Sequence, residues 1–343
     1  MTKIAILGGG SWGTALAIVL SHSRKAHEIS LWMRDAALAE AASTSRENEL
    51  YLPRCVVPAE VEITNSQEKC LAGARIVIGA MPSAYARHVY MQALPFIQDA
   101  VFVSATKGLE PATHLRMSEV IAQVFVERHA PPVAVLSGPS FALEAARGDP
   151  TAVVVASQEK THEGDPLTDY IQAEFATPSF RVYTNDDLVG VELAGAMKNV
   201  MAIAAGACQG LGLGANAIAA LITRGLAEMS RLALVMGARA ETLSGLAGLG
   251  DLVLTCTGAL SRNRQMGIEL GKGRRLNEIL AGTRMVAEGV GTAGALLALA
   301  GDHHIELPIT AQVEAILHRG KSPAEAMHDL MTRSVKSERA SGF

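Results

Sequence analysis

Residues 3–21 read Lys-Ile-Ala-Ile-Leu-Gly-Gly-Gly-Ser-Trp-Gly-Thr-Ala-Leu-Ala-Ile-Val-Leu-Ser, and this stretch decides the fold. The apolar run 4–7 has the pattern of a buried parallel strand, and an apolar helical pattern follows it. Between them, Gly8, Gly10 and Gly13 have the Gly-x-Gly-x-x-Gly spacing: the first glycine allows a tight turn, the second lets the backbone approach a pyrophosphate, and the third lets the helix pack close to the strand. The start of such a helix presents free N–H groups to phosphate. A glycine-rich turn without a ligand is the alternative, but the strand–turn–helix context favours a dinucleotide site.

The rest of the first half alternates strand and helix patterns. Strands are predicted at 3–7, 28–32, 75–80, 100–104, 132–137, 151–156 and 180–184, and helices at 12–23, 83–94, 114–128, 140–147 and 167–175. This alternation predicts an α/β, Rossmann-like, doubly wound domain with a mostly parallel sheet, which binds ligands at the carboxyl ends of its strands. Three polar segments fall at such ends: Ala80-Met81-Pro82-Ser83, Ala105-Thr106-Lys107-Gly108 and Ser137-Gly138-Pro139-Ser140.

Strand patterns disappear after about residue 186, where Asp186 is suited to cap a helix. Helical spacing follows at 187–207, 214–236, 261–271, 285–300, 309–319 and 322–332. We therefore predict a dinucleotide-binding domain at 1–186 and an all-α domain, which binds substrate and carries catalytic groups, at 187–343. The apolar stretch 193–207 contains Lys198, and we interpret it as too short and too polar to span a membrane and as a helix buried in protein.

Composition narrows the class of protein. The 343 residues are 49% hydrophobic but only 4% aromatic, so the core must consist mainly of aliphatic side chains. A net charge of −4 argues against a broad nucleic-acid surface. The four cysteines are scattered and lack the spacing of a zinc site, so reduced thiols and no metal are expected. Because the chain starts directly with a strand, we predict no signal peptide and a cytoplasmic location.

The end of the second predicted strand bears on the choice of cofactor. An NAD site usually places an acid there to hold the ribose hydroxyls, whereas an arginine accommodates the 2′-phosphate of NADP. Here Met33, Arg34 and Asp35 follow the strand. Arg34 favours NADPH, Asp35 is compatible with NADH, and both could be solvated charges. We expect NADPH or NADH to bind, with NADPH preferred.

Two lysines are candidates for chemistry. Lys107 lies at the carboxyl end of a predicted strand, although loop lysines are common. Lys198 has small or apolar helical neighbours, so it either extends to the surface or is desolvated. Desolvation and a nearby cation both disfavour the charged form of lysine, and a buried lysine can therefore act as a base near neutral pH.

Two further segments carry polar groups in informative settings. Asp251 is the one acid in the apolar segment 248–257, where it either caps a helix or orients a lysine. Ser261, Arg262, Asn263 and Arg264 open a predicted helix, where they either form a phosphate site or are an N-cap with solvated arginines.

Taken together, these segments resemble the bacterial-type NAD(P)-dependent glycerol-3-phosphate dehydrogenase family over nearly the whole chain. The matching stretches are 8–16 (Gly-Gly-Gly-Ser-Trp-Gly-Thr-Ala-Leu), 105–110 (Ala-Thr-Lys-Gly-Leu-Glu), 137–142 (Ser-Gly-Pro-Ser-Phe-Ala), 195–200 (Gly-Ala-Met-Lys-Asn-Val), 221–229, 247–256, 261–264, 286–289 (Val-Ala-Glu-Gly) and 307–310 (Leu-Pro-Ile-Thr).

The resemblance implies reversible, NAD(P)H-dependent reduction of dihydroxyacetone phosphate to sn-glycerol 3-phosphate, which supplies phospholipid synthesis. It also implies roles for individual residues. Lys198 is the implied general acid and base, with Lys107 and Asp251 as the other catalytic residues. Lys107 is expected to add positive charge near the reacting oxygen and to hold down the pKa of Lys198.

The implied binding residues form two overlapping groups. Those implied for the dinucleotide are Gly8, Gly10, Ser11, Trp12, Gly13, Arg34, Tyr51, Lys107, Ala142, Arg262, Val286 and Glu288. Those implied for the substrate are Lys107, Gly138, Ser140, Lys198, Asp251, Ser261, Arg262 and Asn263.

Two rival functions stay open at this point. A 3-hydroxyacid or phosphogluconate-type dehydrogenase shares the two-domain pattern and the helix lysine, but the segments 248–252 and 261–264 favour a triose phosphate. A dinucleotide-sensing regulatory protein would need neither Lys198 nor Asp251. We expect a small-molecule substrate and neither nucleic acid nor a transmembrane segment, and a homodimer is left open.

Overall fold

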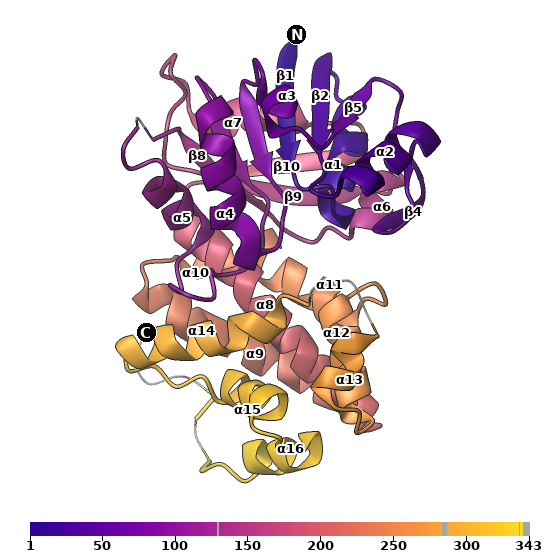
Figure 1. The fold of residues 1–343 in the computed structure, drawn as a ribbon. Helices are drawn as coiled ribbons and strands as arrows, with labels where there is room; N and C mark the ends of the chain where they lie inside the picture. Colours follow the sequence, from indigo (N-terminus) through magenta and orange to yellow (C-terminus); the bar gives the residue numbers. More distant parts are fainter. Residues whose placement is uncertain (129, 283–286, 336, 339–343) are drawn as a thin grey trace.

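Eight strands form one sheet in the order β10-β9-β8-β7-β6-β1-β2-β5 in the computed structural model, which describes residues 1–128, 130–282, 287–335 and 337–338. The strands are β1 (Thr2–Leu7), β2 (His27–Trp32), β5 (Val61–Thr64), β6 (Ile76–Gly79), β7 (Val101–Ser104), β8 (Val133–Ser137), β9 (Thr151–Ala156) and β10 (Phe180–Asn185). The sheet half lies above a helical half in Figure 1. This confirms the predicted fold class, an α/β Rossmann-like half followed by an all-helical region.

Strand direction in the sheet changes once. From β5 through β2, β1, β6 and β7 to β8 all neighbours pair in parallel, whereas β8 and β9 pair antiparallel. The connection between β8 and β9 carries only the five-residue helix α6 (Ala142–Ala146). Such a helix rises about 7.5 Å, which does not return the chain to the far edge of the sheet, so β9 enters in the opposite direction.

Helices cover both faces of the sheet, as the alternating pattern predicts. One core joins α1 (Ser11–Ser21), α6 and α7 (Leu167–Phe175) to one face through residues such as Ile4 and Ile6. The other joins α4 (Ser83–Ala93) and α5 (Met117–Val124) to the opposite face through residues such as Ala5 and Leu7. Alternate side chains of β1 thus enter opposite cores, as in a strand buried on both sides.

Sequence patterns missed several short elements between the second and third predicted strands. They are α2 (Ala36–Ser45), β3 (Glu47–Asn48), β4 (Leu52–Val56), β5 and α3 (Gln67–Leu71). In α2 the described buried positions are the small residues Ala39 and Ala42, which give little hydrophobic periodicity. The 3-10 turn η1 (Leu94–Phe96) also follows α4.

The helical half is built around α8 (Leu188–Gly210), whose residues 190–208 are buried. Against it pack α9 (Ala215–Val235), α11 (Asp251–Thr257), α12 (Arg262–Gly271) and α14 (Gly289–Asp302). The remaining helices are α10 (Ala240–Ser244), the π-helical turn η2 (Leu246–Gly250), α13 (Leu276–Ala281), α15 (Pro308–His318) and α16 (Pro323–Met331). Residues 285 and 286 of the predicted helix 285–300 lie outside the described residues.

The expected buried helix α8 is confirmed, but its predicted N-cap and the judgement that its apolar stretch is too short and too polar are wrong. Its N-cap is Asp187, whose carboxylate accepts a hydrogen bond from the Gly190 N–H at 2.8 Å, whereas Asp186 pairs with Arg239. With 23 residues, α8 is also longer than the apolar stretch 193–207 and is long and apolar enough to cross a membrane. However, 83% of its most apolar window is buried inside the protein, as in the core helix of a globular fold.

A buried ion pair joins the two halves beside α8. The Glu192 carboxylate accepts hydrogen bonds from Arg116 Nη1 at 2.7 Å and from the backbone N–H and hydroxyl of Ser118 at 2.8 and 2.7 Å. Arg116 and Ser118 lie at the start of α5, and Glu192 lies in the second turn of α8. These contacts fix the position of α8 relative to the carboxyl edge of the sheet.

Candidate active site

The carboxyl ends of β1, β6, β7 and β8 lie at one edge of the sheet, which faces the helical half (Figure 1). The strand order reverses between β1 and β6, and open α/β sheets bind ligands at such a point. A cavity of about 610 Å³ begins there and extends to α8, α11 and α12. Its walls therefore come from both halves of the chain.

The glycine-rich turn has the geometry that a dinucleotide requires. Gly8 has a φ of +122°, and a Cβ there would lie 2.6 Å from the Ala80 carbonyl oxygen. A Cβ on Gly13 would lie 1.9 Å from the Gly8 oxygen, so helix and strand could not pack as closely. A Cβ on Gly10, in contrast, meets nothing within 4 Å among the described atoms, because this residue borders the cavity. These contacts fit the expected roles of the three glycines.

The start of α1 is open to a ligand. Among the described residues, no side chain caps this helix, whose N-cap is Gly10. Nearby, the Ser11 hydroxyl donates to the Tyr51 carbonyl at 2.7 Å, and the Asn48 amide donates to the Gly9 carbonyl at 2.9 Å. These bonds place the 48–51 segment beside the turn. The buried indole N–H of Trp12 has no hydrogen-bond partner in the described part of the chain.

The two charged side chains that follow β2, Arg34 and Asp35, differ in the contacts that they make. The Asp35 carboxylate caps α2 by accepting from the Leu38 N–H at 3.0 Å. Arg34 is exposed at the cavity, and its guanidinium carbon lies 5.4 Å from the centre of the Tyr85 ring. Both residues line the cavity, but one oxygen of Asp35 is engaged by the helix, whereas Arg34 has the Tyr85 ring as its contact among the described residues.

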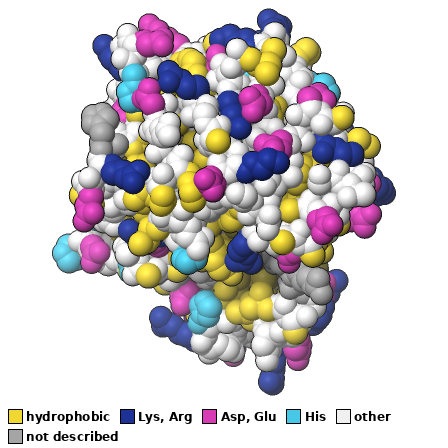
Figure 2. Space-filling view, turned by 45° about the horizontal axis from the view of Figure 1, so that its top comes forward, with side chains coloured by type: hydrophobic (Ala, Val, Ile, Leu, Met, Phe, Trp, Pro, Cys, Tyr) yellow, Lys and Arg dark blue, Asp and Glu magenta, His cyan; other side chains and the backbone are white. Residues whose placement is uncertain are grey.

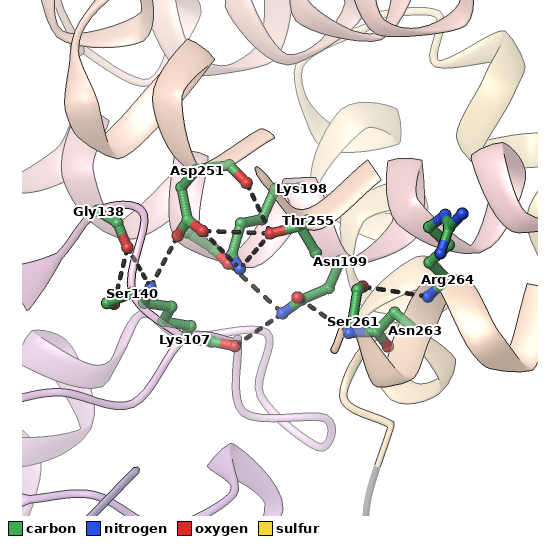
Figure 3. Close-up of polar contacts among 11 residues, drawn as sticks. Lys107, Gly138, Ser140, Lys198, Asn199, Asp251, Thr255, Ser261, Asn263 and Arg264 are labelled. Atoms are coloured by element: carbon green, nitrogen blue, oxygen red, sulfur yellow. Dashed lines mark hydrogen bonds and ion pairs between the residues drawn. The ribbon is translucent and has the colours of Figure 1, made fainter. Parts of the chain in front are cut away.

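Two lysines that line the cavity converge on one buried carboxylate (Figure 3). Asp251, in the first turn of α11, accepts from Lys107 Nζ at 2.7 Å and is paired with Lys198 Nζ at 3.0 Å. Lys107 extends from the loop after β7 and Lys198 from the middle of α8, while Asp251 is only 1% exposed. Of the alternatives left open for Asp251, the structure supports a residue that orients lysines.

Burial and mutual charge shift the pKa values within this cluster. Burial, the largest cause, together with the positive charge of Lys198, lowers the pKa of Lys107 to about 8, although Asp251 acts in the opposite direction. Burial alone would raise the pKa of Asp251, but the two lysines outweigh it and hold that pKa below its ordinary value. Asp251 is therefore ionised at neutral pH.

The two ammonium groups differ in how many of their protons are in use. Lys107 donates to Asp251, to the Gly138 carbonyl at 2.8 Å and to the Ser140 hydroxyl at 3.4 Å. Lys198 has Asp251 and the Thr255 hydroxyl, at 2.9 Å, as its partners among the described residues. An ammonium carries three N–H donors, so one donor of Lys198 has no partner among the described residues, and the residue lines the cavity.

A chain of amide hydrogen bonds connects the walls of the cavity. The Asn199 side-chain amide donates to the Lys107 carbonyl at 3.2 Å, and its oxygen accepts from the Asn263 amide at 3.0 Å. The Asn263 oxygen in turn accepts from the Gly289 N–H at 3.1 Å. These hydrogen bonds fix the relative positions of four elements: the loop after β7, α8, α12 and the start of α14.

The sequence left two interpretations of the segment 261–264, a phosphate site or an N-cap with solvated arginines, and the structure has features of both. Ser261 is the N-cap of α12 and accepts from the Arg264 N–H at 3.3 Å. Arg262 is exposed and lines the cavity together with Ser261 and Asn263, whereas Arg264 bonds Gln209 and the Gly258 carbonyl. The helix start is thus capped, and one of its two arginines is available to an anion.

Most residues that the sequence singled out border this one cavity. Its described lining includes Gly8, Gly10, Ser11, Trp12, Arg34, Tyr51, Lys107, Ser140, Ala142, Lys198, Ser261, Arg262, Asn263 and Glu288. Gly13, Gly138 and Asp251 lie behind the wall and contact residues that form it. Val286 lies outside the described residues.

Glu288 adds an acid to a basic region. Burial, opposed by Arg262 and the two lysines, raises the pKa of this carboxyl group to about 7. One of its oxygens is buried and has no hydrogen-bond partner among the described residues. A partly protonated carboxyl group therefore borders the cavity at neutral pH.

Sequence reasoning missed Asn199, Thr255 and Tyr85 as site residues. Asn199 had a readable signal, because it is an amide beside Lys198 in an otherwise apolar helix. Thr255 lies four residues after Asp251, so the helical repeat places both on one face. Tyr85 gave no signal beyond its place after a strand, since its partner Arg34 is distant in sequence.

The fold and the cavity define a dinucleotide-dependent oxidoreductase with a paired-lysine centre. The sequence model described as NAD-dependent glycerol-3-phosphate dehydrogenase N-terminus matches residues 3–163, and its C-terminus counterpart matches 187–328. The chain belongs to the NAD-dependent glycerol-3-phosphate dehydrogenase family.

Relatives named glycerol-3-phosphate dehydrogenase (NAD(P)+) align over nearly the full length. The protein from Koribacter versatilis is 54% identical over 98% of this chain and 99% of its own. That from Acidobacterium capsulatum is 50% identical over 98% and 100%. The crystal structure of glycerol-3-phosphate dehydrogenase from Coxiella burnetii is 41% identical, with a TM-score of 0.90 over 97% of this chain and 99% of that one.

Proposed function

We propose that the protein reduces dihydroxyacetone phosphate reversibly to sn-glycerol 3-phosphate with NADPH or NADH. The observation that carries the proposal is the continuity of one cavity, from the glycine-rich turn after β1 to the cluster of Lys107, Lys198 and Asp251. Gly8, Gly10 and the open start of α1 would hold a dinucleotide in the same cavity that Lys107 and Lys198 line. Full-length similarity to enzymes of this name supports the substrate.

The chemistry divides between cofactor and protein. When bound, NADPH or NADH would supply the hydride that reduces the carbonyl carbon of the substrate. Lys198 donates a proton to the carbonyl oxygen, which becomes the hydroxyl of the product, and accepts that proton in the reverse direction. The free N–H of Lys198, beside bonds to Asp251 and Thr255, supports this assignment. A proton donor must reach the oxygen by hydrogen bonding, and a lysine with all donors engaged would first have to break a bond.

Lys107 and Asp251 assist the reaction at the substrate carbonyl oxygen without donating the proton to it. Lys107 holds a positive charge near the oxygen, where negative charge develops in the transition state. Asp251 positions both ammonium groups and compensates part of their charge. Its burial excludes water, so the orientation is kept without competition from solvent.

The substrate phosphate binds at the start of α12 in this proposal. Arg262 is exposed at the cavity, and the guanidinium group suits bidentate phosphate binding. Asn263, Ser261 and Ser140 supply further polar groups around the substrate, and Gly138 positions the Lys107 ammonium. Residues 1–186 then bind the dinucleotide, while 187–343 contribute Lys198, Asp251 and the phosphate site.

We extend the proposal to the cofactor and infer a preference for NADPH. Arg34 and Asp35 both line the cavity, but one Asp35 oxygen caps α2, whereas Arg34 has no hydrogen bond or ion pair among the described residues and suits a 2′-phosphate. Arg34→Ala should weaken NADPH more than NADH, with a loss of ~1.5–3 kcal/mol for a desolvated charged contact. Equal losses for the two cofactors would show that Arg34 does not bind the phosphate.

The wider cellular role is part of the same proposal. The product sn-glycerol 3-phosphate contains the glycerol backbone of phospholipids, so we propose that the enzyme supplies phospholipid synthesis. We also propose that it acts in the cytoplasm and forms a homodimer. Size-exclusion chromatography with light scattering tests the assembly, and a mass of one chain across micromolar concentrations would refute the dimer.

A substrate panel tests the central proposal. Purified protein should oxidise NADPH or NADH with dihydroxyacetone phosphate and leave 3-oxo acids unchanged. Dihydroxyacetone without phosphate is the matched control, because it keeps the carbonyl and removes the group that Arg262 would bind. Turnover of a 3-oxo acid, with none of dihydroxyacetone phosphate, would favour the rival dehydrogenase class.

A further inference from the structure

We infer that Tyr85 is a specificity-determining residue, which positions Arg34 for the adenosine phosphate of NADPH. The inference rests on the proposed role of Arg34. Tyr85 lies in the first turn of α4, directly after the β6 end of the cavity, while Arg34 lies at the end of β2. Both line the cavity, and the guanidinium carbon is 5.4 Å from the centre of the ring.

Tyr85 is placed to hold the guanidinium without occupying its donors. A cation within about 6 Å of an aromatic centroid is attracted by the ring face. The five N–H donors of arginine lie in the guanidinium plane, so a group that is covered on one face still presents them to a phosphate. No hydrogen bond or ion pair competes for Arg34 within the described ranges, which makes the ring its identified contact.

The surroundings explain why a positioning group is needed. Arg34 is exposed, and a long, exposed side chain loses rotamer freedom when it binds a ligand. Tyr85 is 45% exposed, but its backbone is fixed by the helix and by the hydrogen bond from its N–H to the Pro82 carbonyl at 3.0 Å. A ring on a fixed backbone can restrict the arginine before the cofactor arrives, which lowers the entropy cost of binding.

Four variants test the inference: Tyr85→Leu, Tyr85→Phe, Arg34→Gln and the double variant Arg34→Gln/Tyr85→Leu. The readouts are the KM ratio of NADH to NADPH and the binding of adenosine 2′-monophosphate against adenosine 5′-monophosphate. Arg34→Gln should reduce the preference for the 2′-phosphate on the order of 10- to 100-fold. Tyr85→Leu should reduce it about 2- to 5-fold, the range for an exposed cation–ring contact.

Controls separate positioning from direct contact with the adenine. Tyr85→Phe keeps the ring and should retain the wild-type ratio. In the double variant, the leucine should add nothing to the Arg34→Gln ratio, because Tyr85 acts through the arginine. Thermal unfolding should be close to wild type for all four, since both side chains are exposed.

The outcomes distinguish failure of the inference about Tyr85 from failure of the proposed NADPH preference through Arg34. If Tyr85→Leu weakens NADPH and NADH equally, the ring contacts the adenine itself and the inference is wrong. An unchanged ratio in Tyr85→Leu, or a loss in Tyr85→Phe equal to that in Tyr85→Leu, also overturns it. If Arg34→Gln itself leaves the ratio unchanged, the proposed NADPH preference through Arg34 fails, and the inference fails with it.

Discussion

Replacing Lys198 with methionine should abolish turnover and leave both the fold and cofactor binding nearly intact. Lys198 is 7% exposed in the middle of α8, where its neighbours other than Asn199 are apolar or small. Methionine keeps most of the stem and removes the ammonium. Asp251 does not lose its only counter-charge, because Lys107 stays 2.7 Å away. We therefore expect a loss of unfolding free energy below the about 3–5 kcal/mol that is typical when one partner of a buried ion pair is removed and the other is left without a counter-charge.

The kinetic effect should be much larger than the effect on stability. General acid–base groups typically contribute ~10²–10⁴-fold to the rate. At about 1.4 kcal/mol per factor of ten, the loss corresponds to about 3–6 kcal/mol of transition-state stabilisation. It should appear in kcat, while NADPH affinity, measured by fluorescence titration, changes little. A Met variant that kept more than about a tenth of the wild-type kcat would show that Lys198 is structural.

Rescue with small amines distinguishes the roles of the two lysines. Lys198→Ala opens a space at the cavity wall, where a primary amine can act as the missing acid. The rescued rates should follow the pKa of the added amine, as general acid catalysis requires. Lys107→Ala is the matched control, because Lys107 uses its donors on Asp251, Gly138 and Ser140 and should show no such dependence. Rescue of the Lys107 variant alone would reverse the two assignments.

Three further predictions follow from charged groups in the described structure. Asp251→Asn removes the carboxylate that the two lysines share, so chemical denaturation should show a loss of ~3–5 kcal/mol; a loss below about 1 kcal/mol would contradict the pairing. Because the pKa of Lys107 is lowered to about 8, this lysine is neutral above that pH, and kcat/KM for reduction should fall as the pH rises through about 8; a flat profile from pH 7 to 9 would refute this. Glu228 accepts from the N–H groups of Ile309 and Thr310 at 2.8 Å, so Glu228→Ala should cost about 2–4 kcal/mol of stability with unchanged KM values, and a matched rise in KM would point instead to a link with the cavity.

Sequence periodicity predicted the main strands and the large helices because their burial is one-sided or complete. Residues 4–7 of strand β1 are an unbroken apolar run between two cores, and the apolar stretch around Lys198 lies within the buried helix α8. The helix α11 is different, since its buried residues include Asp251 and Thr255. These two polar side chains are buried because they form part of the site. They interrupt the hydrophobic spacing by which a helix is predicted. The antiparallel direction of β9 was not predicted for another reason. Strand direction depends on how far the preceding helix carries the chain, and hydrophobic spacing does not report that distance.

The candidate site was predictable in its residue types but not in its contacts. Lys107, Lys198 and Asp251 each stand out locally as a charge at a strand end or in an apolar segment. The distances between them depend on how the loop after β7 packs on α8 and α11, and no local pattern encodes that packing. The same reason explains why Asn199 and Tyr85 were missed, since each acts through a partner distant in sequence.

The charge balance of the cluster suggests why two lysines share one aspartate. With all three groups ionised, Lys107, Lys198 and Asp251 carry two positive charges and one negative charge, an excess of one positive charge in a buried region. This excess is unfavourable without a ligand, and it contributes to the lowered pKa of Lys107. Negative charge on the substrate oxygen grows during hydride transfer, and the cluster is then best neutralised. An exact match of charges in the free enzyme would stabilise the resting state instead, so the unpaired positive charge favours the transition state over the bound ketone.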